Sequence, residues 1–195
     1  MKRFFSLFLC LCLSMGVFTI SALAAPEWPS DVSIQADGGI VMDAGTVLYG
    51  KNMDQPYYPA SITKILTALI VLEHCDLDEM VSFSHDDVYN VEAGSSSAGI
   101  DEGDVLTVRD CLYALMLASA NESANALACH VSGSREEFAK LMNEKAASLG
   151  CTGSHFANPS GLNDENHYTT AHDMALIARE AIKNPEFLAI NGTRS

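Results

Sequence analysis

The chain has 195 residues, with 11 Lys plus Arg against 25 Asp plus Glu and a formal net charge of −14. A hydrophobic content of 48 % with only 18 % charged residues excludes a disordered chain. The length suits one domain. The acidity argues against nucleic-acid binding and against attachment to anionic lipid through a folded surface.

The N-terminus has the pattern of a secretory signal peptide. Met1-Lys2-Arg3 precedes an apolar run from Phe4 to Leu23, and the small residues around Leu23 suit cleavage after Ala24. We therefore predict a signal peptide over residues 1–24 and an exported mature region over 25–195. The alternative is an uncut membrane anchor, because the run is close to the lower limit for spanning a bilayer.

The mature region keeps four of the six cysteines: Cys75, Cys111, Cys129 and Cys151. Outside the cytosol they could form disulfides, but apolar helical sequence around Cys111 and Cys129 also suits buried free thiols. Residues 65–108 hold many acids and no Lys or Arg. We interpret this stretch as a solvated acidic surface, since it contains no calcium-loop motif.

The first elements of the mature region are a hairpin and a helix. Two β-rich runs within residues 39–49 flank an Asp-Ala-Gly turn, which predicts a β-hairpin. Residues 61–74 are apolar almost all round, which predicts a buried central helix. Residues 75–105 are expected to be mostly loop.

The remaining sequence is predicted to be helical. Capping-box pairs predict helices over 108–118, 135–149 and 171–183, with a shorter helix over 122–131; the pairs are Thr107 with Asp110, Ser134 with Glu137, and Thr170 with Asp173. Pro185 is expected to lie beyond the last helix. Apart from a short extended piece at 151–156, we expect no further strand.

Ser61-Ile62-Thr63-Lys64 is the most informative tetrapeptide for chemistry. Ser61 and Lys64 are three residues apart, so they share a helix face. Burial lowers the pKa of a lysine, and a neutral amine can take the proton of a serine hydroxyl. The alternative is a serine helix cap beside a lysine that extends to solvent.

Ser119-Ala120-Asn121 is the second candidate, at the predicted junction of two helices. A serine and an asparagine there are commonly helix caps. As functional residues, Ser119 would relay a proton and Asn121 would hold a substrate amide.

These motifs resemble those of the serine-type D-Ala-D-Ala carboxypeptidases, low-molecular-weight penicillin-binding proteins of peptidase family S11. Further segments share the likeness: Gly94-Ser95-Ser96, Asn158-Pro159-Ser160-Gly161-Leu162 and Asp164-Glu165-Asn166-His167-Tyr168. The resemblance implies an α+β, β-lactamase/transpeptidase-like fold with an antiparallel sheet flanked by helices. It implies no cofactor and no catalytic metal.

The resemblance also implies a role for each candidate residue. Ser61 would attack the carbonyl of the penultimate D-Ala in a peptidoglycan stem peptide, and Lys64 would be the general base. Ser119 would pass a proton to the leaving amine, while Asn121 would bind the substrate backbone. β-Lactams would acylate Ser61 as substrate mimics, and an anchor on the parent protein would be compatible with the family.

The sequence departs from the family pattern in two places. Ala120 stands where the family usually has Gly, and no K-T-G motif occurs in the 195 residues. We therefore expect residues 25–195 to be a truncated catalytic domain without the C-terminal strands, with a bare sheet edge.

Three alternatives differ in chemistry. One is an inactive relative that only binds cell wall, and another is a β-lactamase-like serine hydrolase. The third is a metallopeptidase built from histidines and acids near the end of the chain, although their spacing matches no metallopeptidase motif: His155, His167, His172, Asp164, Glu165 and Asp173.

Overall fold

The computed structural model describes residues 33–193. The predicted signal peptide over residues 1–24 lies outside the described residues. Within them, no helix combines the length and the apolar character needed to cross a membrane.

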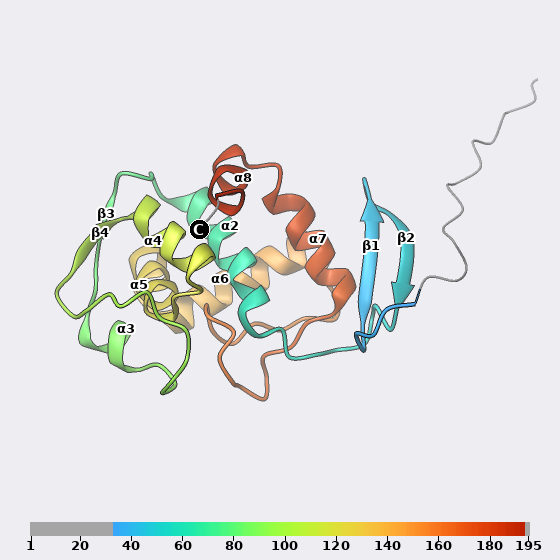
Figure 1. The fold of residues 1–195 in the computed structure, drawn as a ribbon, viewed down its shortest axis with the longest axis horizontal. Helices are drawn as coiled ribbons and strands as arrows, with labels where there is room; N and C mark the ends of the chain where they lie inside the picture. The colour runs from blue at the N-terminus through green and yellow to red at the C-terminus, as the bar shows by residue number, and fades with distance from the viewer. Residues whose placement is uncertain (1–32, 194–195) are drawn as a thin grey trace, which may run out of the picture. The chain divides into compact units, whose positions relative to one another are not determined.

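The chain folds into a hairpin, a small second sheet and a set of helices (Figure 1). The elements in chain order are β1 (Gly39–Asp43), β2 (Thr46–Lys51), the 3₁₀ turn η2 (Ala60–Thr63), α2 (Lys64–His74), β3 (Met80–Ser82), α3 (His85–Tyr89), β4 (Val105–Thr107), α4 (Val108–Leu117), α5 (Asn121–Ser132), α6 (Arg135–Ser148), α7 (Ala171–Ala181) and α8 (Pro185–Asn191).

Helix α2 is the centre of the hydrophobic core, as its composition predicts. It contacts α4, α5, α6, α7 and α8, and its residues Leu66–Val71 are all buried. A helix surrounded on all sides has no need of a polar face. The α-helix itself begins at Lys64, however, so the predicted start at residue 61 is wrong by one turn: Ser61 lies in η2.

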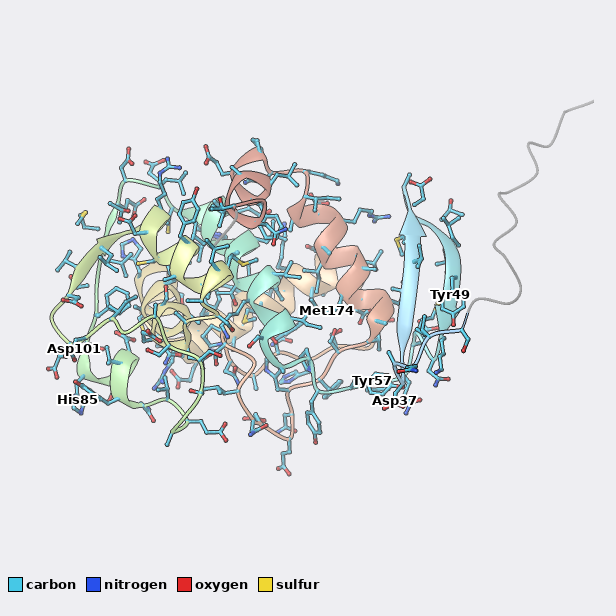
Figure 2. All side chains as sticks on the ribbon, in the orientation of Figure 1. Asp37, Tyr49, Tyr57, His85, Asp101 and Met174 are labelled. Carbon is cyan, nitrogen blue, oxygen red and sulfur yellow. The ribbon has the colours of Figure 1, made fainter. Side chains whose placement is uncertain are left out.

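The predicted hairpin is confirmed. β1 pairs antiparallel with β2, and the turn uses positive φ at Ala44 (46°) and Gly45 (94°). Strand β1 contacts α7. At the other end of the hairpin, Lys51 Nζ donates to Ala36 O at 2.8 Å, so the segment that contains Asp37 (labelled in Figure 2) lies against β2.

The predicted helix starts are confirmed by their caps. The side chains of Thr107, Ser134 and Thr170 accept hydrogen bonds from the backbone N–H three residues on, at the starts of α4, α6 and α7. Each cap satisfies one of the N–H groups that a helix start leaves without an intrahelical partner. Gly150, with φ 87°, follows the end of α6 as predicted.

Three expectations about secondary structure are wrong. The expectation of no further strand is wrong, since β3 pairs antiparallel with β4. Residues 75–105 are mostly loop, as expected, although they also contain β3 and α3. Three-residue strands are too short to show an alternating pattern. The expected strand at 151–156 is only a single bridge between His155 and Tyr168.

The third error is a missed helix: Pro185 lies beyond the end of α7, as predicted, but it also begins α8. Asn184 caps α8 by accepting from the N–H groups of Glu186 and Phe187. Proline suits the first position of a helix because its missing N–H would have no intrahelical partner there.

Candidate active site

Ser61 is held in an exposed position by an unusual backbone. Its neighbour Ala60 has φ 49°, in the left-handed region, which residues other than Gly and Asn rarely adopt. Gly161 packs so closely on Ala60 that a Cβ added to Gly161 would lie 1.9 Å from Ala60 O. Strained backbone of this kind gathers at functional sites, where the surrounding structure holds it in place.

Lys64 lies buried below the exposed serine, with 2 % of its surface exposed. Its Nζ donates to Asn121 Oδ1 and to Ser160 O, both at 2.8 Å, and lies 3.3 Å from Ser61 Oγ. Burial lowers the pKa of Lys64 from 10.5 to about 8, and the charge of Glu122 acts in the opposite direction. The alternative of a lysine that extends to solvent is therefore wrong.

The partners of Lys64 define how its neutral form would be oriented. A backbone carbonyl and an amide oxygen can only accept hydrogen bonds, so they take the two N–H bonds of a neutral amine. The lone pair is then left for the third neighbour, Ser61 Oγ. The site can thus hold the amine ready to take a proton from the serine.

The second predicted motif contacts both residues of the first. The Ser119 hydroxyl donates to Ser61 Oγ at 3.0 Å, and Ser119 has φ 56°. Asn121 is buried at the start of α5, where its side chain reaches Lys64. The structure therefore brings all four sequence-predicted residues together, with Ser61 and Lys64 from η2 and the start of α2 and the other two from the α4–α5 junction.

The segment 158–162 supplies a site residue that sequence reasoning did not assign. Asn158 Oδ1 accepts from the backbone N–H groups of Ser160 and Gly161, which bends the chain into a turn. The turn is fastened to α2, since Thr67 Oγ1 donates to Pro159 O at 2.7 Å. This presents the Ser160 carbonyl to Lys64. The signal in the sequence was the Asn-Pro-Ser-Gly turn pattern itself.

His167 supports the backbone next to Ser61. Its Nδ1 accepts from Ala157 N at 3.0 Å, so Nε2 carries the proton and donates to Thr63 Oγ1 at 2.8 Å. Burial lowers the pKa of His167 from 6.5 to about 4, which keeps the imidazole neutral. His167 thus links Ala157 to Thr63, two residues after Ser61.

Glu122 links the loop at residues 94–99 to the site. This buried carboxylate accepts from Ser97 Oγ at 2.8 Å and from Ala98 N at 2.6 Å through Oε1, while Asn121 N donates to Ser96 O at 3.1 Å. The loop is thereby fixed against the start of α5. The sequence alone contained no signal for this pairing.

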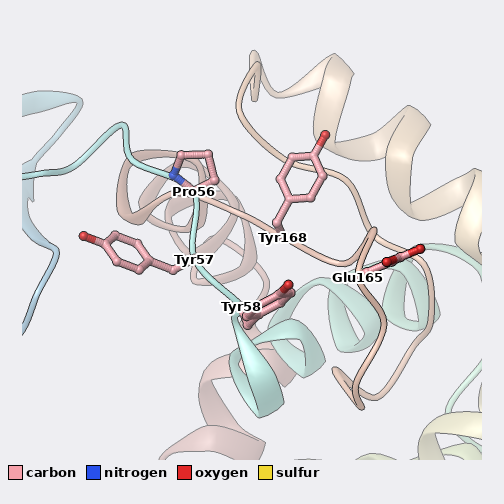
Figure 3. A pocket seen from close by; sticks show the side chains of 5 residues that line it. All are labelled: Pro56, Tyr57, Tyr58, Glu165 and Tyr168. Carbon is pink, nitrogen blue, oxygen red and sulfur yellow. The ribbon is translucent and has the colours of Figure 1, made fainter.

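A pocket of about 420 Å³ is lined by residues on the N-terminal side of Ser61 and by residues from the 164–168 segment (Figure 3). Its walls are Pro56, Tyr57, Tyr58, Glu165 and Tyr168. A backbone bridge between Tyr57 and Thr169 holds the two segments together. Tyr58, three residues before Ser61 in the chain, is 73 % exposed and gives this pocket an aromatic wall.

The histidines of the metallopeptidase alternative each have a different hydrogen-bond partner. His155 Nδ1 bonds Asn166 O, and His172 Nδ1 lies 3.1 Å from Asp54 Oδ1. Asp173 accepts from Gly153 N and Ser154 Oγ. These residues therefore have structural partners, and they do not converge on one point as metal ligands would.

The four cysteines of the described region are free thiols. Burial raises the pKa of Cys111 and Cys151 to about 12 and that of Cys75 and Cys129 to about 11. None therefore has the lowered pKa of a thiol nucleophile.

Comparison with known proteins agrees with the geometry. Residues 24–195 match the family of peptidase S11, D-alanyl-D-alanine carboxypeptidase. The chain is 36 % identical to the D-alanyl-D-alanine carboxypeptidase DacF of Bacillus subtilis, over 99 % of this chain and 51 % of DacF. It is 37 % identical to DacB2 of Mycobacterium tuberculosis, over 87 % of this chain and 56 % of DacB2.

Solved structures show the same fold. The DacD carboxypeptidase of Francisella tularensis superposes with a TM-score of 0.78 at 35 % identity, covering 84 % of this chain and 41 % of that one. The Streptomyces K15 DD-transpeptidase superposes with a TM-score of 0.79 at 34 % identity, covering 84 % and 66 %. The chain thus spans about half the length of the curated relatives it matches. From its motifs, fold and similarity, the chain belongs to the peptidase S11 family of D-alanyl-D-alanine carboxypeptidases.

Proposed function

We propose that the protein is an exported serine-type D-Ala-D-Ala carboxypeptidase that removes the terminal D-Ala from peptidoglycan stem peptides. The observation that carries the proposal is the buried Lys64 amine, placed 3.3 Å from the exposed Ser61 hydroxyl and tied on its other sides to acceptors. Family membership supplies the substrate class. β-Lactams are proposed as covalent inhibitors, and no cofactor is needed for this chemistry.

The first half of the proposed reaction is acylation. Ser61 Oγ attacks the carbonyl carbon of the penultimate D-Ala while its proton passes to neutral Lys64. The tetrahedral intermediate then breaks its C–N bond, and the leaving amine takes a proton through the Ser119 hydroxyl. Since Lys64 holds Asn121 Oδ1, the Asn121 amide N–H groups are oriented to donate to a substrate carbonyl.

The second half is hydrolysis of the ester on Ser61. Water attacks the acyl carbon, Lys64 takes its proton, and Ser61 Oγ leaves as the hydroxyl. Both halves need Lys64 without its proton. The acylation rate is therefore expected to rise as the pH increases through the lysine pKa of about 8 and to level off above it.

The test is covalent labelling with a fluorescent penicillin, followed by mass spectrometry of the labelled peptide. We expect one adduct on Ser61, no adduct in Ser61→Ala, and strongly slowed labelling in Lys64→Ala. The exposed residues Ser148 and Lys140 give matched controls, and Ser148→Ala and Lys140→Ala should label at the normal rate. Labelling that persists in Ser61→Ala would refute the nucleophile, and a normal rate in Lys64→Ala would refute the base.

A further inference from the structure

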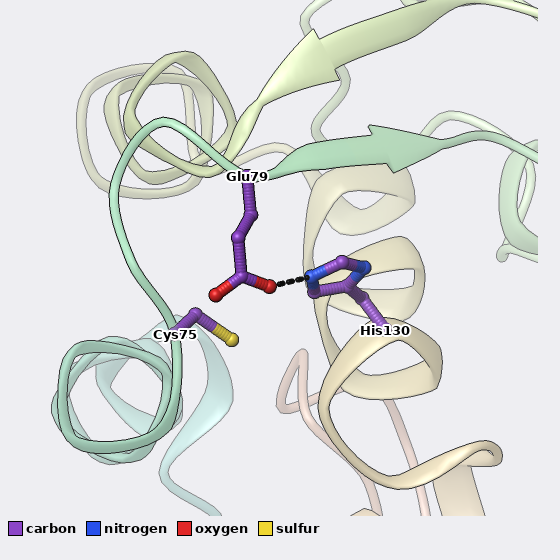
Figure 4. A group of neighbouring side chains, drawn as sticks. All are labelled: Cys75, Glu79 and His130. Carbon is purple, nitrogen blue, oxygen red and sulfur yellow. Dashed lines mark hydrogen bonds and ion pairs between the residues drawn. The ribbon is translucent and has the colours of Figure 1, made fainter.

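A second cluster of reactive side chains lies at the opposite end of α2 from Ser61. Its three side chains are drawn in Figure 4. Cys75 follows the last residue of α2, Glu79 precedes β3, and His130 lies in the last turn of α5. The Cys75 Sγ, one Glu79 carboxylate oxygen and one His130 ring nitrogen all lie within 4.8 Å of one another. In the described part of the chain, these are the only three such side chains that converge in this way.

The backbone positions of the cluster are held by hydrogen bonds. Cys75 N donates to Val71 O at 3.0 Å, and Val108 N donates to Glu79 O at 2.8 Å. The Glu79 carboxylate is oriented as well, because its Oε1 accepts from Asp76 N at 2.7 Å. Its Oε2 then faces His130 Nε2 at 2.9 Å. An outer hydrogen bond that orients a carboxylate ligand is typical of metal sites.

The distances are close to those around one metal ion. Zinc lies about 2.3 Å from a thiolate sulfur and about 2.0–2.2 Å from imidazole nitrogen and carboxylate oxygen, so its tetrahedral ligand atoms are about 3.3–3.7 Å apart. The three ligand atoms of the cluster reach this spacing if side-chain rotation shortens the longest distance between them, at most 4.8 Å, by about 1 Å. Glu79 and His130 have the freedom to rotate, since their side chains are 43 % and 24 % exposed.

The local charge also favours a cation. Residues 65–108, which include Cys75 and Glu79, contain no Lys or Arg, and Asp76 and Asp78 lie between these two residues in the chain. Thiolate and imidazole ligands bind zinc and similar borderline metals more strongly than they bind calcium or magnesium, because those two ions prefer oxygen ligands.

We propose that Cys75, Glu79 and His130 bind one borderline divalent transition metal, Zn²⁺ or a close equivalent, with water as the fourth ligand. On binding, the thiol loses its proton and the metal replaces the hydrogen bond between Glu79 and His130. The ion would join the end of α2 to α5 and to the loop before β3. The site lies away from the proposed nucleophile, and the inference is independent of the proposed carboxypeptidase activity.

The test uses the full chain, stripped with a chelator and titrated with Co²⁺ as the spectroscopic probe. We expect a thiolate-to-cobalt charge-transfer band in the near ultraviolet that saturates at one equivalent and disappears when Zn²⁺ is added. Cys75→Ser should abolish the band, and His130→Gln should weaken Co²⁺ binding at least about 10-fold.

Two matched variants serve as controls. Cys151→Ser removes another half-buried thiol, and His85→Gln breaks a similar exposed pair, since His85 Nδ1 lies 2.9 Å from Glu102 Oε2 without a neighbouring thiol. Both should bind Co²⁺ as the unaltered chain does. Absence of the band at millimolar Co²⁺, or its persistence in Cys75→Ser, would overturn the proposal. His130 is exposed, so His130→Gln stays informative even if Cys75→Ser folds poorly.

Discussion

Replacing Gly161 with alanine tests whether the 158–162 turn positions the nucleophile. The new Cβ would lie 1.9 Å from Ala60 O and 2.4 Å from Ala60 C, in the residue just before Ser61. Both neighbours are backbone atoms, so no side-chain rotation relieves the overlap. Either the Ala60–Ser61 backbone moves or the turn moves, and a moved turn takes the Ser160 carbonyl away from Lys64.

The expected loss in the free energy of unfolding of Gly161→Ala has two parts. Gly161 has φ +83°, and alanine in this conformation costs about 1–2 kcal/mol. Overpacking adds about 1–3 kcal/mol, for a total of about 2–5 kcal/mol. Gly133 provides the matched control, since it has φ +82° and nothing within 4 Å of an added Cβ. Gly133→Ala should therefore cost only the first part.

The free energy of unfolding is measured by urea denaturation followed by far-ultraviolet circular dichroism. Acylation by fluorescent penicillin is then measured in each variant under conditions where it is folded. We expect Gly161→Ala to lose more stability than Gly133→Ala and to acylate at least about 10-fold more slowly, a cost of about 1.4 kcal/mol in the activation barrier. Equal losses of stability, or an unchanged acylation rate in Gly161→Ala, would refute the close contact as a positioning device.

Three further predictions concern the supporting residues. Glu122→Gln keeps an acceptor for Ser97 but removes the charge that raises the pKa of Lys64, so the pH of half-maximal acylation should fall below about 8. Burial lowers the pKa of His167 to about 4 in the folded state, so its contribution to the free energy of unfolding should be constant above pH 6.5 and fall by about 3 kcal/mol as the pH falls to 4, measured by urea denaturation at each pH. Ser134→Ala removes the cap of α6 and should cost about 1 kcal/mol of unfolding free energy, measured in the same way.

Each of these has a clear contrary result. An unchanged or raised half-maximal pH in Glu122→Gln would contradict the electrostatic role of that carboxylate. For His167, the free energy of unfolding is compared between the unaltered chain and His167→Gln from pH 4 to 6.5. The variant should show a smaller slope with pH, and equal slopes would contradict a buried neutral histidine. For Ser134, a loss no larger than that of Ser148→Ala in the same helix would contradict the cap.

The local features of the fold could be predicted because their causes lie within a few residues. A threonine or serine cap acts on an N–H three positions away, so Thr107, Ser134 and Thr170 marked their helix starts. The hairpin turn at Ala44–Gly45 is likewise a local conformational preference. Pro185 was correctly placed beyond the preceding helix, but the helix that it begins was missed, because proline is compatible with both the region after one helix and the first position of the next.

Pairing over longer distances could not be predicted in the same way. The strands β3 and β4 are three residues each and stabilise one another across the loop that contains α3. Neither strand is long enough to show a period of its own. Helix α3 has only five residues and depends on the capping box of Ser84 with Asp87.

In the candidate site, too, residues in short motifs could be predicted, and residues brought close by long-range packing could not. Its reactive residues were visible in the sequence because Ser61 with Lys64, and Ser119 with Asn121, form short motifs that resemble a known family. The residues that hold them are distant in the chain: Ser160 lies 96 positions from Lys64, and His167 lies 104 positions from Thr63. Such contacts are set by the packing of α2 against the rest of the core.

Local propensity and short motifs were enough to predict the central apolar helix, the capped helices, the hairpin and the four candidate residues. Tertiary packing buries Lys64 and directs its amine at Ser61 through Asn121 and Ser160. It also places Cys75, Glu79 and His130 together at the other end of α2. Burial and convergence are properties of the packed chain, since they depend on which distant segments exclude water from the same point.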